Sequence, residues 1–398
     1  MKIIERPKYL NKIEKFRDKQ IIKVLTGMRR VGKTTLLKQL NERLLKDNSN
    51  ANSIFINKEY YEFKTIKTSD DLYQYVNSKA IKGEENYVFV DEVQEIENFE
   101  IALRQLMVEG FDIYISGSNA KMLSGDLATY LSGRYIEFKI KPLDYKEFIE
   151  FHGLNGNNDS LMKYIKYGGL PYLINLELED ELVYEYLRNI YNTIILKDVV
   201  ARYNIRDIDF LERLIEYLSD NIGSYTSSKK IIDFLKSQGI ILSVNTVLNY
   251  LKFLSNAFFI EKIRRYDILG KKIFEINDKY FFEDLGLKHA IIPFRVQDTG
   301  KIFENLVCNR LTGDGYTVYV GKLRDKEIDF VAKKNDEIIY IQVAYLIESE
   351  DVINREFGNL LRIKDNYKKI VVSASNFMES DYKGIRHIHI LEFLKGNY

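Results

Sequence analysis

One short stretch of the sequence combines residue types that bind phosphate. Residues 27–34 read Gly-Met-Arg-Arg-Val-Gly-Lys-Thr, in which four residues separate the two glycines and a Lys and a hydroxyl residue follow. Backbone N–H groups of such a loop point at a β-phosphate, Lys33 reaches the β and γ oxygens, and the Thr34 hydroxyl ligates Mg²⁺. The sequence therefore predicts a nucleoside triphosphate site whose nucleotide-binding residues are Gly27, Met28, Arg29, Arg30, Val31, Gly32, Lys33, Thr34 and Thr35.

The segments on either side of this loop fit a strand and a helix. Residues 21–25 are apolar and β-branched, as in a buried strand, and residues 34–46 carry leucines at helical spacing. The order strand, loop, helix places an anion at the N-terminus of the helix. This context argues against a chance match of the motif.

Two carboxylates follow a second apolar strand pattern further along the chain. Residues 87–90 are apolar, and Asp91 and Glu92 come directly after them. Ligands of parallel sheets bind at the carboxyl ends of the strands, so we expect Asp91 to hold Mg²⁺ and Glu92 to polarise the attacking water. An acidic strand end can also be a solvated turn, but the phosphate loop upstream supplies the other half of one site.

Further strand patterns complete the predicted sheet. Residues 53–57 form one, and residues 112–119 form another with a polar tip, at which Ser118 and Asn119 are expected to sense the γ-phosphate. A fifth strand begins at residue 135, directly after Arg134, which as bare sequence is a surface charge. Residues 20–140 therefore predict an α/β fold, a three-layer parallel sheet with alternating helices.

Together these motifs resemble the prokaryotic AAA-type, STAND-like P-loop ATPases that carry a C-terminal restriction-endonuclease-like domain. The resemblance rests on the phosphate loop, Asp91-Glu92, the Gly-Ser-Asn tip, Ser-Gly-Arg before the fifth strand and Lys-Pro-Leu after it. It implies that Arg134 is an arginine finger acting on a neighbouring subunit, and hence a homo-oligomer. It also implies that Pro171, in a Gly-Gly-Leu-Pro turn, belongs to a helical lid over the adenine.

The nucleotide is expected to be ATP, with Mg²⁺. A GTPase needs an Asn-Lys-x-Asp guanine reader, and the nearest match, residues 57–60, lacks the Asp. ATP is therefore favoured over GTP.

Residues 205–288 predict a winged helix-turn-helix. Three amphipathic helices precede two strands, residues 259–263 and 272–276, and residues 262–272 hold five basic side chains against one acidic, a local charge of +4. In such a fold the third helix enters the major groove of double-stranded DNA and the hairpin contacts phosphate. The expected DNA contacts are Asn245, Asn249, Lys252, Arg264, Arg265, Lys271 and Lys272. Docking of a protein partner remains an alternative, because local charge does not identify the partner.

The last hundred residues or so, a helix followed by three strands, resemble the core of PD-(D/E)xK nucleases. The resemblance implies a second divalent metal site made by Glu304, Asp329 and Gln342. It departs at Ala344, where the nuclease pattern has a Lys, so we expect a nuclease fold without nuclease turnover. Lys322, Lys333 or Lys334 could still supply the missing ammonium from another strand.

Length and composition limit the number of domains, the cellular location and the kinds of partner that we expect. The 398 residues, 45% of them apolar, predict an ATPase domain at 1–145, a helical lid at 146–204, the winged helix at 205–288 and the nuclease-like domain at 289–398. A net charge of +1 gives no whole-chain field for nucleic acid or membrane. A single cysteine excludes an internal disulfide, and no apolar run approaches the ~20 residues that span a bilayer. The charged N-terminus does not resemble a secretory signal, so we expect a cytoplasmic protein.

The sequence thus predicts a Mg²⁺-dependent ATP-hydrolysing switch that couples its nucleotide state to DNA or to a protein partner. Two alternatives remain at this point. One is an ATP-regulated, metal-dependent DNA nuclease, and the other is an ATPase whose C-terminal half is a non-enzymatic docking module.

Overall fold

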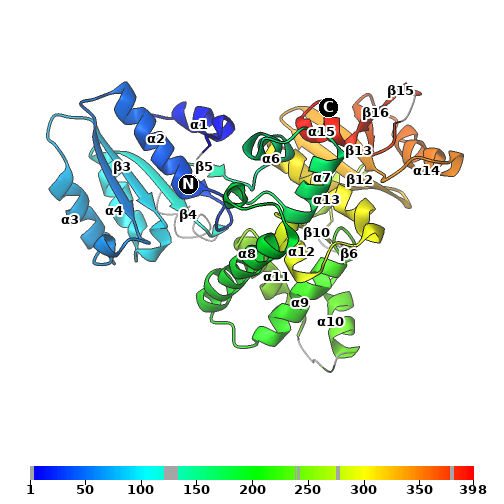
Figure 1. Ribbon diagram of the computed structural model, residues 1–398, viewed down its shortest axis with the longest axis horizontal. Helices are drawn as coiled ribbons and strands as arrows, with labels where there is room; N and C mark the ends of the chain where they lie inside the picture. The colour runs from blue at the N-terminus through cyan, green and yellow to red at the C-terminus, as the bar shows by residue number, and fades with distance from the viewer. Residues whose placement is uncertain (1–3, 121–132, 238, 240–242, 275–277, 377–380) are drawn as a thin grey trace. The chain divides into compact units, whose positions relative to one another are not determined.

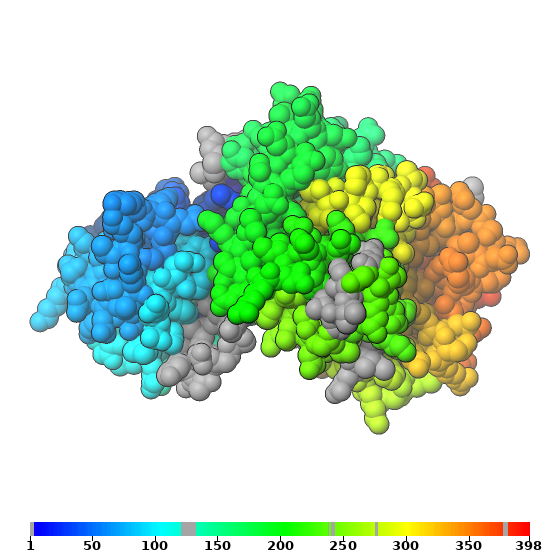
Figure 2. All heavy atoms as spheres, turned by 90° about the horizontal axis from the view of Figure 1, so that it is seen from below, coloured from blue at the N-terminus to red at the C-terminus, as the bar shows by residue number. Residues whose placement is uncertain are grey.

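The computed structural model describes residues 4–120, 133–237, 239, 243–274, 278–376 and 381–398 (Figure 1, Figure 2). The chain forms two compact units, residues 1–141 with 256–258, and residues 142–255 with 259–398. None of the described helices combines the length and the hydrophobicity that a membrane-spanning helix needs. The predicted division into four domains, at 1–145, 146–204, 205–288 and 289–398, stays a prediction.

The first unit is built on a five-stranded sheet in the order β2-β3-β4-β1-β5. Every neighbouring pair is parallel, which confirms the five strands predicted from the sequence. Its strands are β1 Ile22–Thr26, β2 Asn52–Asn57, β3 Asn86–Asp91, β4 Asp112–Gly117 and β5 Tyr135–Lys139. β1 is buried along its whole length, as expected for a strand covered on both faces of a parallel sheet.

Helices cover both faces of this sheet, and Figure 1 shows α2 and α3 on opposite sides of it. Side chains of α3 and α4 share one apolar core with β1 to β4. On α2, Leu36, Leu37, Leu40 and Leu44 are buried, and Leu45 is exposed. The bounds are α1 Pro7–Glu14, α2 Lys33–Asp47, α3 Ser69–Lys79 and α4 Phe99–Val108, with short 3-10 turns η1 Tyr61–Phe63 and η2 Val93–Glu95. A capping box between Thr68 and Asp71 fixes the start of α3.

The second unit begins with helices, as predicted for the lid and the winged helix. These are α6 Tyr145–His152, α7 Asn158–Tyr167, η4 Pro171–Asn175, α8 Asp180–Thr193, the π-helix η5 Ile194–Ala201, α9 Ile208–Asp220, α10 Ser228–Ser237, α11 Val244–Asn256 and α12 Leu285–Ile291. A small antiparallel sheet in the order β6-β10-β7 accompanies them. Its strands are β6 Tyr225–Thr226, β7 Ile260–Ile263 and β10 Asp278–Phe282.

A mixed sheet of eight strands completes this unit, in the order β15-β16-β14-β13-β12-β11-β8-β9. Its strands are β8 Arg265–Asp267, β9 Lys272–Ile273, β11 Thr317–Leu323, β12 Lys326–Lys334, β13 Glu337–Val343, β14 Lys368–Ser373, β15 Asp381–Tyr382 and β16 Ile385–His389. The helical elements beside it are η6 Val296–Asp298, α13 Thr299–Gly313, α14 Glu350–Leu361 and α15 Ile390–Lys395. The predicted helix and three strands of the C-terminal region are therefore present, and the nuclease-like identity stays a prediction.

In the structure, the strands of the expected wing pair differently from the prediction. The two predicted strands do not pair with each other: β7 pairs with β10, whereas β9 pairs with β8. β8 in turn joins β11 in parallel register, with Val320 opposite Arg265, so the hairpin extends the large sheet. An exposed strand edge offers a row of unpaired N–H and C=O groups, and here the edge of β11 takes up the hairpin. The end of the second predicted strand, residues 275–276, lies outside the described residues.

Candidate functional site

The phosphate loop connects β1 to α2 and depends on its glycines. Gly27 and Gly32 have φ angles of 144° and 95°, and a Cβ on Gly27 would lie 2.1 Å from the carbonyl oxygen of Ile140. Lys33 is the first residue of α2, and its Nζ donates to the carbonyl oxygens of Gly27 and Met28 at 2.9 and 3.0 Å. The loop thus curls around the Lys33 ammonium at a helix N-terminus, which favours an anion.

Asp91 meets the loop directly. The Thr34 hydroxyl donates to Oδ2 of Asp91 at 2.7 Å, and the Ser116 hydroxyl donates to Oδ1. The register of β3 with β4 pairs Val90 with Ile115, which brings Asp91 beside Ser116. Burial raises the pKa of Asp91 above its ordinary value, against the effect of both hydroxyl donors. A hydroxyl and a carboxylate oxygen are ligands that suit Mg²⁺, so Thr34 and Asp91 fit this ion.

Glu92 is held in an unusual backbone conformation beside Asp91. Its φ is 54°, and its N–H donates to the hydroxyl of Ser116 at 3.2 Å. Its carboxylate accepts hydrogen bonds from Ser118, at 3.2 Å, and from the Gln94 amide. Burial opposes ionisation, but the Lys33 ammonium and these donors bring the pKa of Glu92 below its ordinary value. Glu92 is therefore ionised and suited to orient a water molecule or accept its proton.

The other predicted nucleotide-site residues take different places. Ser118 and Asn119 are both buried after β4, and Ser118 contacts Glu92. Met28 and Val31 are buried in the loop, and Thr35 is half-buried in the first turn of α2. Arg29 pairs with Glu59, the two side chains being 3.4 Å apart, and Arg30 is exposed with a φ of 69°.

Arg134 and Pro171 lie in separate units. Arg134 is exposed directly before β5, and its carbonyl oxygen accepts a hydrogen bond from the N–H of Ile22 at 2.9 Å. Pro171 opens η4 after the Gly168-Gly169 turn, in which Gly169 donates to Oδ2 of Asp284 at 2.7 Å. The roles of Arg134 in catalysis and of Pro171 at the adenine stay predictions.

Arg6 supports the loop, and its part could not be predicted from the sequence. Its buried guanidinium donates to the carbonyl oxygens of Val31, at 3.2 Å, and Lys141, at 2.9 Å. It also lies 4.6 Å from the centre of the Tyr9 ring, and the Tyr9 hydroxyl accepts a hydrogen bond from the N–H of Lys141. The segment before β1 thus ties the phosphate loop to Lys141, the second residue after the end of β5.

The predicted DNA contacts divide into exposed and packed residues. On α11, Asn245, Asn249 and Lys252 are exposed, and so are Val244 and Leu248. In the hairpin, Arg264, Lys271 and Lys272 are exposed. Arg265 instead lies between two aromatic rings, 4.9 Å from the centre of Tyr225 and 5.1 Å from that of Phe274. Packing therefore accounts for Arg265, and the other residues remain candidates for a nucleic-acid contact.

The proposed second metal site brings the named residues together but contains a lysine that the sequence did not indicate. Gln342 accepts a hydrogen bond from the backbone N–H of Asp329, and Glu304 pairs with Lys279 of β10. The three lysines suggested from the sequence lie elsewhere: Lys322 near the Phe274 ring, Lys333 over the Tyr266 ring and Lys334 at the carbonyl oxygen of Asp314.

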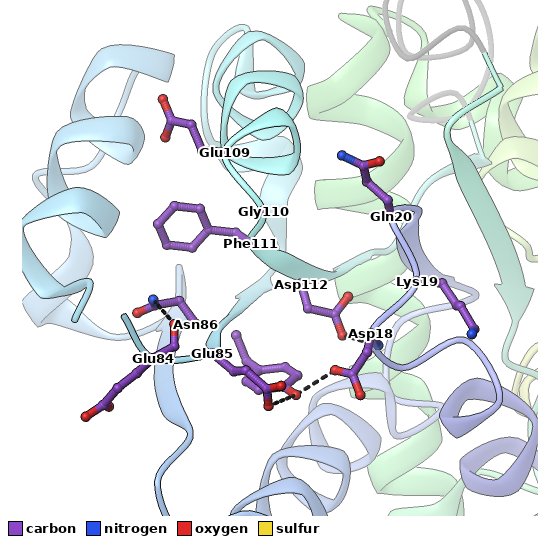
Figure 3. Close-up of a pocket in the computed structure, with 11 residues that line it drawn as sticks. Asp18, Lys19, Gln20, Glu84, Glu85, Asn86, Glu109, Gly110, Phe111 and Asp112 are labelled. Atoms are coloured by element: carbon purple, nitrogen blue, oxygen red, sulfur yellow. Dashed lines mark hydrogen bonds between the residues drawn. The ribbon is translucent and has the colours of Figure 1, made fainter. Parts of the chain in front are cut away.

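A pocket of about 400 Å³ opens at the amino-terminal edge of the first sheet (Figure 3). Its walls come from residues 18–20, 84–87 and 109–112, which precede or begin β1, β3 and β4. The phosphate loop lies at the carboxyl ends of the same strands, so this pocket is not the nucleotide site. Two of its carboxylates have internal partners, because Asp18 accepts from the Tyr87 hydroxyl and Asp112 pairs with buried Lys23.

Comparisons with known proteins agree with this geometry. A family described as "AAA domain" matches residues 19–149, and a domain of unknown function, DUF8612, matches residues 158–298. An uncharacterized protein of Haemophilus influenzae is 38% identical over 98% of both chains. The uncharacterized protein MJ1544 of Methanocaldococcus jannaschii is 33% identical over 81% of this chain and 74% of its own.

Two solved structures show more distant likeness. The Walker-type ATPase PABY2304 of Pyrococcus abyssi is 18% identical, with a TM-score of 0.49 over 73% of this chain and 96% of its own. The ORC1 protein of Aeropyrum pernix, solved in complex with DNA, is 12% identical, with a TM-score of 0.34 over 73% of this chain and 92% of its own. The phosphate loop, the AAA-domain match and the sequence identity to its relatives lead to one conclusion. The chain belongs to a family of AAA-type P-loop ATPases that includes the H. influenzae and M. jannaschii proteins.

Proposed function

We propose that this protein is an ATP- and Mg²⁺-dependent switch whose hydrolysis step is centred on Glu92. The observation that carries the proposal is the meeting of the loop hydroxyl of Thr34 with Asp91, and of Asp91 and Glu92 with the shared hydroxyl of Ser116. Mg²⁺, when bound, neutralises charge on the phosphate oxygens. Thr34 and Asp91 would hold it.

The remaining steps belong to side chains of this chain. Lys33 exchanges its carbonyl partners in the loop for phosphate oxygens of the nucleotide. Glu92, ionised and buried, orients the attacking water, while Ser118 and Gln94 hold its carboxylate in place. Arg6 keeps the loop fixed through the carbonyl oxygen of Val31.

The exposed side chain of Arg134 supports a role in a neighbouring active site. An arginine that stabilises transition-state charge in trans makes hydrolysis depend on assembly. We therefore propose that the protein hydrolyses ATP as a homo-oligomer.

The output of the switch is proposed to be a contact with double-stranded DNA. The exposed Asn245, Asn249 and Lys252 of α11, with the exposed basic residues of the hairpin, favour it. The exposed apolar residues Val244 and Leu248 lie on the same helix and are what a protein partner would contact, so docking is the second candidate.

The test is the rate of phosphate release from ATP with Mg²⁺, with and without duplex DNA, together with the mass of the protein in solution. The wild type should turn over ATP, and Lys33→Ala should not. Lys38→Ala is the matched control, because Lys38 is exposed on the same helix and binds the Tyr60 hydroxyl instead of the loop. A wild type that neither binds nor hydrolyses ATP would overturn the proposal.

A further inference from the structure

A buried lysine lies among acidic residues of the eight-stranded sheet and of the helix α13 beside it. Lys279, on β10 of the small sheet, has its Nζ 2.9 Å from Oε2 of Glu304 on α13 and 2.7 Å from Oε1 of Glu327 on β12. Its side chain is 5% exposed, against 17% for Glu304 and 33% for Glu327. The ammonium therefore sits inside the acidic cluster and joins elements of two different sheets.

The polar groups expected to bind a second metal are already engaged. Oδ2 of Asp329 accepts from the N–H of Val343 at 2.7 Å, and the amide oxygen of Gln342 accepts from the N–H of Asp329 at 2.9 Å. The amide nitrogen of Gln342 donates to Glu356 at 2.8 Å. Among the described residues, no group of three or more His, Cys, Asp or Glu is arranged to hold a metal ion. With the Lys279 ammonium among them, these residues do not fit the divalent ion that the nuclease resemblance implies.

We infer that the Lys279 ammonium is a fixed internal cation that takes the place of this metal and ties β10 to α13 and β12. Burial opposes its charge, but the carboxylates of Glu304, Asp329 and Glu327 hold the pKa of Lys279 above its ordinary value. The Tyr225 ring, 5.4 Å from Nζ, closes another side of the site. The cluster is then a metal-independent connection between the small sheet and the large one, and position 344 has no need of a lysine.

Removal of the lysine should have a different effect at this cluster than at a nuclease site. In Lys279→Met, the acids lose their cation and keep their oxygens, which are the ligands that Mg²⁺ and Mn²⁺ prefer. The variant should gain a divalent-cation site. Lys279→Arg keeps the positive charge and should gain none.

The experiment measures Mn²⁺ binding by electron paramagnetic resonance in nucleotide-free protein that carries Lys33→Ala, which separates the result from the ATPase site. We expect no tight Mn²⁺ in this background or with added Lys279→Arg. With added Lys279→Met we expect about one Mn²⁺ per chain and a thermal midpoint that Mn²⁺ raises. Adding Glu304→Gln to Lys279→Met should remove that site.

Three outcomes would overturn the inference. The first is a tight Mn²⁺ in the Lys33→Ala background that Glu304→Gln abolishes, a result that needs no Lys279 variant to fold. The second is a folded Lys279→Met protein that binds no Mn²⁺. The third is Mn²⁺-dependent cleavage of plasmid by the wild type that Lys279→Met lacks, which would make Lys279 part of a nuclease site. None of these depends on whether the protein hydrolyses ATP.

Discussion

The Thr34 hydroxyl lies 2.7 Å from Oδ2 of Asp91, although 57 residues separate the two in the sequence. One belongs to the first turn of α2 and the other to the end of β3. A site that holds Mg²⁺ beside a nucleotide needs one oxygen ligand from each. The hydrogen bond shows that the fold brings both to the same point.

The different roles of Lys33, which binds the phosphates, and Glu92, which positions the water, lead to the first prediction. Lys33→Ala should lose nucleotide binding, because the loop loses the ammonium that reaches the phosphates. Glu92→Gln should still bind ATP but turn it over ~10²-fold or more slowly, since a neutral amide cannot accept a proton from water. Binding of a fluorescent ATP analogue and phosphate release would be measured on both variants. Hydrolysis by Glu92→Gln at the wild-type rate would show that Glu92 does not position the water.

Ser116 leads to a second prediction, because its hydroxyl serves both carboxylate residues. It donates to Asp91 and accepts from the N–H of Glu92, whereas the Ser118 hydroxyl donates to the Glu92 carboxylate. Ser116→Ala should therefore raise the Mg²⁺ concentration needed for half-maximal ATPase activity and also lower the maximal rate. Removing one such hydrogen bond commonly costs ~1 kcal/mol, or about fivefold.

Ser118→Ala is the matched control for Ser116→Ala. It should lower the maximal rate without moving the Mg²⁺ dependence, because its hydroxyl bonds the Glu92 side chain. A titration of ATPase activity with Mg²⁺ separates the two effects. Identical Mg²⁺ curves for Ser116→Ala and the wild type would show that Ser116 plays no part in holding the ion.

Local motifs in the sequence were enough to predict the first sheet and the centre of its site. The phosphate loop and Asp91-Glu92 are contiguous stretches, and apolar strands of a parallel sheet are recognisable one at a time. Ser116 is different: it lies in the same polar tip as Ser118 and Asn119, and its residue type does not distinguish it from them. Only the register of β3 with β4 shows that Ser116 is the residue beside Asp91.

Contacts between distant segments explain what the sequence could not predict. Nothing around Arg6 or Lys279 marks them as buried cations, because their partners lie far away in the chain: Lys141 for Arg6, and Glu304 and Glu327 for Lys279. The expected pairing of residues 259–263 with residues 272–276 was wrong for the same reason. Short strands can pair with any compatible edge, and β8 pairs with β11, more than a local turn away.

Assembly leads to a third prediction. If Arg134 acts on a neighbouring subunit, specific ATPase activity should rise with protein concentration, and Arg134→Ala alone should be slow because transition-state charge is less well stabilised. Arg134→Ala mixed with Lys33→Ala should recover activity, since a mixed interface joins an intact loop to an intact Arg134. The measurement is phosphate release across mixing ratios, with each variant alone as control. If the mixtures release phosphate no faster than the two variants measured separately and added, Arg134 acts within its own chain or has no role in hydrolysis.

The exposed basic residues of the hairpin lead to a fourth prediction. Replacing Arg264 and Lys271 with Ala should flatten the salt dependence of duplex DNA affinity by about one unit of logarithmic slope for each phosphate interaction that the substitutions remove. Arg265→Ala should leave that slope unchanged and lower the thermal midpoint, because its guanidinium packs between Tyr225 and Phe274. Fluorescence anisotropy at several salt concentrations tests both. Absence of DNA binding at low salt would favour protein docking instead.

His387 leads to a prediction about acid stability. It is buried on β16, its Nε2 lies 2.8 Å from the Ser373 hydroxyl, and burial together with nearby His389 lowers the pKa of His387 to about 4. The unfolded chain takes up a proton at this residue below about pH 6.5, while the folded protein resists protonation until about pH 4. The stability that depends on neutral His387 is therefore complete above about pH 6.5 and is lost as the pH falls toward 4.

His387→Gln should remove this part of the pH dependence, because glutamine does not take up the proton and its amide can bond Ser373. The thermal midpoint of the wild type should fall between about pH 7 and pH 4.5 by roughly 2 °C or more beyond the fall seen in the variant. At pH 7.5 or so, where the wild-type imidazole is neutral in both folded and unfolded chains, the difference between the two midpoints reports only the packing cost of the substitution. Calorimetry at matched ionic strength gives both quantities. Parallel curves for the two proteins from pH 7 to about pH 4.5 would show that His387 is charged, or solvated, in the folded protein.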